Sequence, residues 1–319
     1  MKLLVVASSL DLQQPFSSTP SWWQLLKGLY ENGVDLVVTT YQGPAIETLW
    51  WRAVPNPVKT QGDVFKLVRD TARKIAGPPK QVQVEAPEEE KPESASERLI
   101  RQVAQTTIAP RWRSYLDDLL TQQPDIDAVL FLTIPMNHVT GVAAHLIATH
   151  RKPVFYHDGD LPASLPQFKG FASGFRIYQG ADPGEYTAVL GNSVGALEHV
   201  KALGAKNVHT LQYAADPEVW APLPVEQDLD AFFYGHGAEY REDWLHAMLA
   251  EPSVALPDRR FAVRGTRLGD LGNTELLPYL SFSKLREYAC RSKLNLVITR
   301  QAHASVFASS NSRPFELAA

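Results

Sequence analysis

The residues with the clearest chemical potential occupy positions 309–316, which read Ser-Ser-Asn-Ser-Arg-Pro-Phe-Glu. A serine-rich loop that opens a helix presents backbone N–H groups and the positive end of the helix dipole, which suits a pyrophosphate. Arg313 adds a planar cation that can bind phosphate oxygens bidentately, and Glu316 could accept hydrogen bonds from both hydroxyls of a ribose. The alternative is an ordinary helix that Asn311 or Ser312 caps, with Arg313 and Glu316 solvated.

A strand-to-helix loop at residues 234–241 is a second candidate, with the sequence Tyr-Gly-His-Gly-Ala-Glu-Tyr-Arg. Gly235 and Gly237 allow the backbone to approach a ligand closely, because glycine has no side chain. Arg241 places a further cation at the end of the loop. The dinucleotide fingerprint would need a third glycine, so the same residues also fit a simple tight turn.

His157 and Asp158 follow an apolar run at residues 154–157. His157 could act as a base, and Asp158 could orient a hydroxyl nucleophile. Alternatively Asp158 and Gly159 form a turn that Asp160 caps. His138 is a similar strand-end candidate, with a helix-entry role as its alternative. No second histidine or carboxylate converges on this cluster at helical spacing, so we predict no metal site.

Alternating apolar and amphipathic segments must position these side chains. In the first part of the chain we predict helices at residues 22–30, 141–150 and 195–203, the last closed by Gly204. The apolar runs between them are typical of parallel strands buried on both faces. We predict strands at residues 3–7, 34–39, 128–133, 154–157, 188–192 and 208–212.

The same alternation restarts after residue 228, with predicted strands at 231–234, 261–264 and 295–299 and helices at 241–249, 283–291 and from about 312. A proline-rich stretch at 214–228 is typical of an interdomain connector. We therefore predict an α/β protein with two doubly wound, Rossmann-like parallel-sheet domains that face a cleft. Their bounds are 1–213 and 229–319, with the second domain incomplete. A flexible acidic insertion, flanked by helices, is expected at about 77–98.

Two segments resemble a known family. Residues 187–222 resemble the interdomain crossing of GT-B glycosyltransferases, with Ser193 after a late strand, a Leu-Gly-Ala helix end at 203–205 and an Asp-Pro-Glu-Val-Trp-Ala-Pro connector at 216–222. Residues 293–300 and 309–319 look like the donor-site segment of the spore-maturation (CgeB-like) branch, within the group 1 glycosyl transferases. In many retaining members a further glutamate precedes Glu316, whereas the matching position here is Ala308, so the stereochemical outcome cannot be carried over.

The resemblance implies a hexosyltransferase-type enzyme that moves a sugar from a nucleoside-diphosphate sugar to a hydroxylated acceptor, with no metal and no other cofactor. It places the diphosphate near Gly235 and Arg241 and makes residues 309–316 part of the donor site, with the phosphates at the loop and Arg313 and the ribose at Glu316. From its chemistry alone, His157 could also contact the transferred sugar instead of acting as a base. The serine-rich loop that the resemblance adds to the diphosphate site consists of Ser309, Ser310, Asn311 and Ser312. The first strand-to-helix loop, residues 8–19, would face the acceptor, and the tryptophan pairs at 22–23 and 50–51 are expected to pack in the core rather than on sugars.

Composition narrows the remaining choices. The 319 residues are 45% hydrophobic and carry a formal net charge of −4, so a nucleic-acid partner is not expected. Cys290 is the one cysteine, which fits a reducing compartment, and no apolar run is long enough to span a membrane, so we expect a cytoplasmic protein. A sugar-nucleotide epimerase of the same architecture, a two-lobed ligand-binding protein and a non-catalytic structural member of the family remain alternatives.

Overall fold

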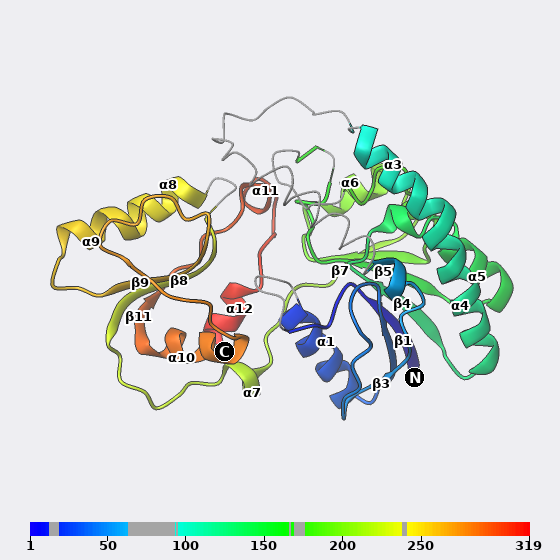
Figure 1. The fold of residues 1–319 in the computed structure, drawn as a ribbon, viewed down its shortest axis with the longest axis horizontal. Helices are drawn as coiled ribbons and strands as arrows, with labels where there is room; N and C mark the ends of the chain where they lie inside the picture. The colour runs from blue at the N-terminus through cyan, green and yellow to red at the C-terminus, as the bar shows by residue number, and fades with distance from the viewer. Residues whose placement is uncertain (13–18, 63–92, 94, 166, 169–175, 238–240) are drawn as a thin grey trace. The chain divides into compact units, whose positions relative to one another are not determined.

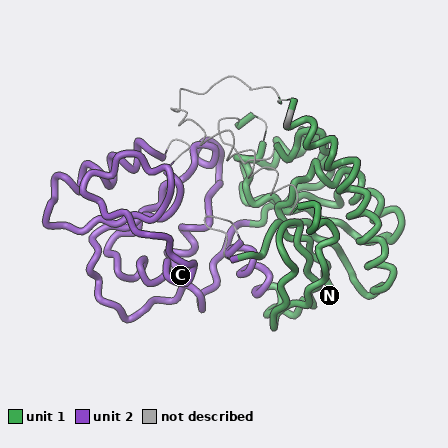
Figure 2. Tube along the Cα trace, in the orientation of Figure 1, with its two compact units in different colours: residues 1–11, 29–211 green, residues 12–28, 212–319 purple. Residues whose placement is uncertain are grey.

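The computed structural model describes residues 1–12, 19–62, 93, 95–165, 167–168, 176–237 and 241–319. The chain divides into two compact units, which Figure 2 shows in green and purple. Unit 1 comprises Met1–Asp11 and Leu29–Leu211, and unit 2 comprises Leu12–Gly28 and Gln212–Ala319. Residues 12–28, which the sequence analysis assigned to the first domain, therefore group with the second unit.

Unit 1 contains a seven-stranded parallel sheet in the order β3-β2-β1-β4-β5-β6-β7. This order reverses direction between β1 and β4, as in a doubly wound fold. The strands are β1 (Lys2–Ala7), β2 (Asp35–Thr40), β3 (Arg52–Ala53), β4 (Ala128–Leu132), β5 (Val154–Asp158), β6 (Ala188–Gly191) and β7 (Val208–Thr210). All six strands predicted in this part of the chain are present, and β3, with two residues, is additional.

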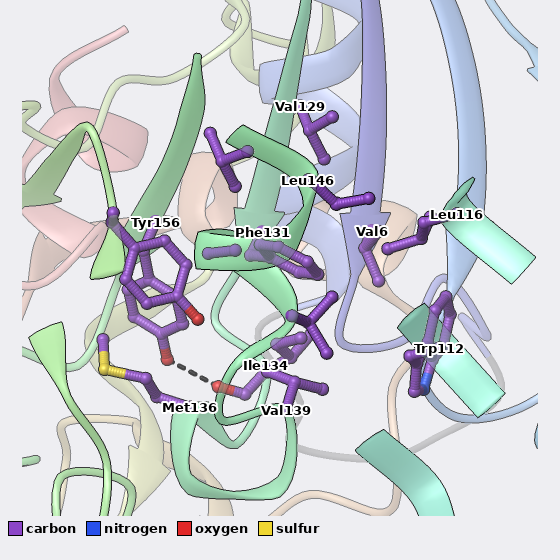
Figure 3. Close-up of a cluster of buried hydrophobic side chains, with 14 of the residues drawn as sticks. Val6, Trp112, Leu116, Val129, Phe131, Ile134, Met136, Val139, Leu146 and Tyr156 are labelled. Carbon is purple, nitrogen blue, oxygen red and sulfur yellow. Dashed lines mark hydrogen bonds between the residues drawn. The ribbon is translucent and has the colours of Figure 1, made fainter. Parts of the chain in front are cut away.

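Helices α4 (Ala109–Gln122) and α5 (Val142–His150) cover one face of this sheet. Trp112, Leu116 and Leu120 recur at helical spacing on α4 and pack on Val6, Val129 and Phe131, as Figure 3 shows for several of these residues. The intervening strand residues Val5 and Leu130 are also buried. Apolar side chains therefore fill both faces, which explains the uninterrupted apolar runs.

Further α-helices described in this part of the chain are α1 (Thr19–Glu31), α3 (Ala95–Val103) and α6 (Leu197–Ala202). A π-helical turn, Ala104–Ile108, joins α3 to α4. Most of the predicted acidic insertion falls outside the described residues, but residues 95–98 of it begin α3. Gly204 follows α6 with φ +108, which agrees with its predicted role at the end of that helix.

Unit 2 contains a four-stranded parallel sheet in the order β10-β9-β8-β11. Its strands are β8 (Leu229–His236), β9 (Phe261–Thr266), β10 (Glu275–Leu276) and β11 (Ser292–Asn295). Its helices are α7 (Pro217–Trp220), α8 (Arg241–Leu245), α9 (Glu251–Ala255), α10 (Phe282–Arg291), α11 (Gln301–Ala304) and α12 (Arg313–Ala318). Alternate residues of β8 enter two hydrophobic clusters: Phe232 and Tyr234 pack with α10, and Ala231 and Phe233 pack with α8. Figure 1 accordingly shows α8 and α9 on one side of the sheet and α10 and α12 on the other.

Two predicted elements of unit 2 need correction. The strand predicted at 295–299 is β11 and ends at Asn295, because Ser292, Leu294 and Asn295 are the residues that pair with β8. The helix predicted at 241–249 contains a π-helical turn, His246–Ala250, and then continues as α9. Both units are nevertheless doubly wound α/β structures with parallel sheets, which confirms the predicted fold class. No helix in the described part of the chain is long and apolar enough to cross a membrane.

Candidate anion-binding site

The site lies at the C-terminal edge of the unit 2 sheet, where ligands bind in doubly wound folds. Strands β8 and β9 end in register, with His236 opposite Thr266 and Gly235 opposite Gly265. His236 Nδ1 lies 2.7 Å from Thr266 Oγ1. The edge therefore places an imidazole at the point where two parallel strands finish.

Arg313 is held against this edge by β8. Its Nε donates to the carbonyl oxygen of Tyr234 at 2.7 Å, and its guanidinium carbon lies 5.0 Å from the centroid of the Tyr234 ring. Gly235 has φ +148, and a Cβ atom there would lie 2.8 Å from Arg313 Nη2. The glycine is needed because a larger residue would displace the guanidinium.

The loop before α12 fixes the backbone of Arg313. Asn311 Oδ1 accepts a hydrogen bond from the Arg313 N–H at 2.9 Å, and Asn311 Nδ2 donates to Thr299 Oγ1 at 3.1 Å. Ser310 Oγ donates to the carbonyl oxygen of Asn311 at 3.1 Å, while the Ser312 side chain makes no capping bond. Asn311 thus supplies the capping interaction that the sequence suggested for Asn311 or Ser312.

Four arginines act on His236 and together form what we call the arginine cluster. The pKa of His236 is lowered to about 4, first by burial and then by the charges of Arg241, Arg300, Arg313 and Arg267. These residues come from four segments: the start of α8, the loop after β9, the residue before α11 and the start of α12. Like charges that gather in this way repel one another, and a bound anion relieves the repulsion.

His303 connects the serine loop to the arginine cluster. It is buried on α11, and its Nδ1 lies 2.7 Å from Ser309 Oγ. The pKa of His303 is lowered to about 4, first by burial and then by the charges of Arg300 and Arg241. His303 therefore lies between Ser309, which it contacts, and the arginine cluster.

Glu316 is buried rather than solvated, with 6% of its surface exposed. Its Oε2 accepts a hydrogen bond from the hydroxyl of Tyr234 at 2.6 Å. The solvated alternative is therefore wrong for this side chain, because the inner face of α12 packs on β8. Since α12 has six residues, its dipole is a minor source of positive potential beside four guanidinium groups.

The candidate residues of unit 1 are also buried. Asp158 is fully buried at the end of β5. Its Oδ1 accepts from the Asp160 N–H at 2.9 Å, and its Oδ2 accepts from the hydroxyls of Tyr178, at 2.8 Å, and Ser164. Burial raises the pKa of the Asp158 carboxyl to about 6, although the Ser164 bond opposes the shift. The predicted turn is present, but Asp158 rather than Asp160 is its capping residue, because the Asp158 carboxylate accepts from the Asp160 N–H.

His157 and His138 share this buried character. His157 is 3% exposed, and burial lowers its pKa to about 4. His138 lies with its Nδ1 2.7 Å from the Tyr41 hydroxyl, and burial lowers its pKa to about 4 as well. Of the tryptophans expected in the core, Trp22 and Trp51 are buried, whereas Trp23 and Trp50 are partly exposed.

The structure brings Gly235, Arg241, Ser309, Asn311 and Arg313 together at one edge of unit 2, whereas His157 and Asp158 belong to unit 1. The sequence analysis did not select His236, Arg267, Arg300 or His303. A usable signal existed for three of them, since His236, Arg267 and Arg300 each lie within three residues after the end of a predicted strand, at 234, 264 and 299. His303 carried no such signal.

Across the described ranges, no group of three or more His, Cys, Asp or Glu residues is placed to hold a metal ion. No protein-family model matches the chain, and no curated protein matches it.

Solved structures do align with it. One is a putative UDP-N-acetylglucosamine 2-epimerase from Listeria monocytogenes, at 9% identity over 92% of this chain and 73% of that chain, with a TM-score of 0.48. A second is MnaA from S. aureus in a co-structure with UDP, at 10% identity over 92% of this chain and 73% of that one, with a TM-score of 0.43. A third is an O-GlcNAc transferase mutant from Thermobaculum terrenum, at 11% identity over 99% of this chain and 50% of that chain, with a TM-score of 0.44.

Proposed function

We propose that the chain is a glycosyltransferase whose unit 2 binds a nucleoside-diphosphate sugar at the arginine cluster. The observation that carries the proposal is the convergence of Arg241, Arg267, Arg300 and Arg313 on the strand edge that ends in His236. A diphosphate diester is a compact dianion, and guanidinium groups are suited to bind its oxygens bidentately. In this proposal arginines, rather than a metal, neutralise the diphosphate.

Each group at the edge has a role in this proposal. Arg313, held by Tyr234, binds one phosphate. Because Gly235 has no side chain, the ligand can approach its backbone next to the Arg313 guanidinium. Arg241 and the loop of Ser309, Ser310, Asn311 and Ser312 contact the other phosphate. Glu316, oriented by the Tyr234 hydroxyl, uses its second carboxylate oxygen to accept from a ribose hydroxyl.

The proposed chemistry is transfer of the sugar to a hydroxylated acceptor. Its rate would come from positioning the two substrates and from stabilising the departing diphosphate by fixed cations. We assign the acceptor side to unit 1, where His157 would contact the transferred sugar. The buried Asp158 would act as a positioning residue, because its two carboxylate oxygens hold the chain from Asp160 to Tyr178 at the end of β5.

The finer assignment rests on residues 309–316 of the sequence, which favour the spore-maturation (CgeB-like) branch of the GT-B glycosyltransferases. With its single cysteine, the protein is proposed to act in the cytoplasm.

Thermal shift with UDP-, dTDP-, GDP- and ADP-sugars tests the donor site. A ligand at about 100 times its Kd adds about 2.7 kcal/mol to the free energy of unfolding, so one nucleotide class should raise Tm clearly. Arg313→Ala and Glu316→Ala should lose that shift. Arg259→Ala is the matched control, because Arg259 lies outside the cluster in an exposed pair with Asp230. Equal shifts for all four proteins would overturn the site.

Measuring the reaction products then distinguishes a glycosyltransferase from an epimerase and from a non-catalytic protein. The proposal predicts release of nucleoside diphosphate that depends on an added acceptor. Conversion of the donor to an isomer by the protein alone would indicate an epimerase, and binding without turnover would indicate a non-catalytic protein; either result contradicts a transferase.

A further inference from the structure

His236 occupies an unusual electrostatic position for a histidine at a strand end. It follows Gly235, which lies against the guanidinium of Arg313, and it precedes Gly237, where an added Cβ atom would lie 2.1 Å from the carbonyl oxygen of Arg267. Its Nδ1 is 2.7 Å from Thr266 Oγ1 on the neighbouring strand. The ring is therefore held by Thr266, and the backbone on its two sides packs against the guanidinium of Arg313 and the main chain of Arg267.

Among the described residues, the charges that lower the pKa of His236 are all cations: Arg241 at the start of α8, Arg267 after β9, Arg300 before α11 and Arg313 at the start of α12. Partial burial adds to their effect, because a low local dielectric penalises the charged imidazole. In the ligand-free protein the ring is thus held neutral, with a pKa of about 4.

We propose that a diphosphate enters this site together with one proton, which His236 takes up from solvent. The inference rests on the proposed donor site, and it deepens that proposal by linking ligand binding to pH. A bound dianion offsets the arginine charges that keep the ring neutral and adds an attractive charge beside it. The only bond formed is N–H on the imidazole, the proton comes from water or buffer, and no bond of the ligand breaks.

The linkage has a definite sign. Because the bound form holds the proton more tightly than the free form, affinity rises as pH falls from the bound midpoint towards about 4. Within that window the Kd for the diphosphate should fall by up to about tenfold for each pH unit. Below about 4 both forms are protonated and the dependence disappears.

The alternative is that His236 only joins the ends of β8 and β9 through Thr266. A structural role of that kind would leave its titration unaffected by an anion. NMR of protein labelled with ¹³C-histidine separates the two cases, because the midpoint of each ring is followed directly with and without saturating inorganic pyrophosphate. His236→Gln assigns the signal, and His303→Gln assigns the other histidine near Arg241 and Arg300.

We expect the His236 midpoint to lie well below about 6.5 in the free protein and to rise by at least about two units with pyrophosphate. Calorimetry in buffers of different ionisation enthalpy should show proton uptake that His236→Gln abolishes. The exposed residue His246 provides the control variant His246→Gln, which should retain the uptake.

Three outcomes would overturn the inference. If pyrophosphate shifts other signals of the site while the His236 midpoint stays fixed, the proton linkage is wrong and the donor site stands. If the midpoint of His303 moves instead, the proton has been assigned to the wrong ring. If pyrophosphate perturbs no signal of the arginine cluster, the linkage and the proposed donor site both fail.

Discussion

At the scale of single residues, Gly235 determines where Arg313 can lie. The backbone at φ +148 is one that side-chain-bearing residues rarely adopt, and the space that a Cβ atom would need is occupied by the guanidinium. An added Cβ atom would therefore strain the backbone of β8 and displace the Arg313 side chain, and both effects raise the free energy of the folded state. In the proposed donor site, Gly235 therefore acts on the ligand through Arg313.

Gly235→Ala should keep the fold and weaken binding. We expect a loss of stability of roughly 1–3 kcal/mol from the strained backbone and a Kd for the nucleoside diphosphate that rises at least about tenfold. Gly28→Ala is the control: Gly28 lies in α1 with no atom within 4 Å of an added Cβ, so stability should stay equal or increase. Calorimetric titration measures both variants; unchanged affinity in Gly235→Ala would contradict the role given to Arg313.

Asp158 provides a prediction about pH. Its carboxyl has a pKa of about 6 in the folded protein against 3.8 ordinarily, so the folded state favours the protonated form. The stability that this contributes is complete below about pH 4 and is lost as pH rises through about 6, a change on the order of 3 kcal/mol. Asp158→Asn should flatten that part of the pH dependence of the free energy of unfolding in urea. An equally steep dependence in the variant would show that another group is responsible.

Residue chemistry near the donor edge was predictable only in part. Gly235, Asn311 and Arg313 could be selected one by one, because glycine, a short capping side chain and arginine each have local signatures, and the family resemblance then assigned them to one diphosphate site. The burial of Glu316 had no such signature, since it depends on Tyr234, which lies 82 residues away. His303 was missed for the same reason, because the arginines that surround it come from other segments.

At the scale of elements, helix α1 is attached to the connector of unit 2. Lys27 forms ion pairs with Asp216, at 2.8 Å, and with Glu218, at 3.0 Å, and Gln24 accepts a hydrogen bond from the Asp216 N–H at 2.8 Å. The ring of Trp22 stacks on Tyr213. Asp216 also caps α7, so one carboxylate joins two helices.

Lys27→Ala should be strongly destabilising. The side chains of Lys27 and Asp216 are 10% and 8% exposed, and removing the lysine leaves a buried carboxylate without its cation, at a cost on the order of 3 kcal/mol. Lys201→Ala removes an exposed pair with Glu198 and should change stability by less than about 1 kcal/mol. Urea unfolding measures both, and hydrogen exchange should rise in α1 and α7 of the first variant. Equal effects of the two substitutions would contradict the buried attachment.

Most elements were predictable because long apolar runs leave few alternatives. Strands β1, β2, β4, β5 and β6 are each almost fully buried, so each contains a run of at least three consecutive apolar residues. The two-residue strands β3 and β10 are too short to show a period. Strand β11 was predicted too far along the chain. Its residues Lys293 and Leu294 are exposed, so the strand lacks an apolar run, whereas the apolar residues that follow it do not pair as a strand.

At the scale of the whole molecule, the chain is two α/β units, and unit 2 includes a segment from the N-terminal part of the chain, Leu12–Gly28. The sequence indicated two domains because the strand–helix alternation stops at a proline-rich stretch and then restarts. It could not indicate that residues 12–28 group with unit 2, since α1 looks like any helix that follows a first strand. That grouping depends on Lys27, Gln24 and Trp22 finding partners nearly two hundred positions later.

The net charge of −4 contrasts with the cationic edge of unit 2. The positive charges of Arg241, Arg267, Arg300 and Arg313 act at one edge of unit 2, although the chain as a whole has a net negative charge. In the proposed function, this charge distribution attracts an anionic ligand to one place without making the whole surface a binder of polyanions. This contrast is the whole-molecule argument for a small diphosphate ligand.

The most direct test is a crystal structure of the protein with the nucleoside diphosphate that gives the largest thermal shift. We predict that the two phosphates lie at the end of β8, within hydrogen-bond reach of the guanidinium groups of Arg241 and Arg313 and beside Gly235. Density for the nucleotide at another place, or a phosphate position out of reach of both arginines, would contradict the account.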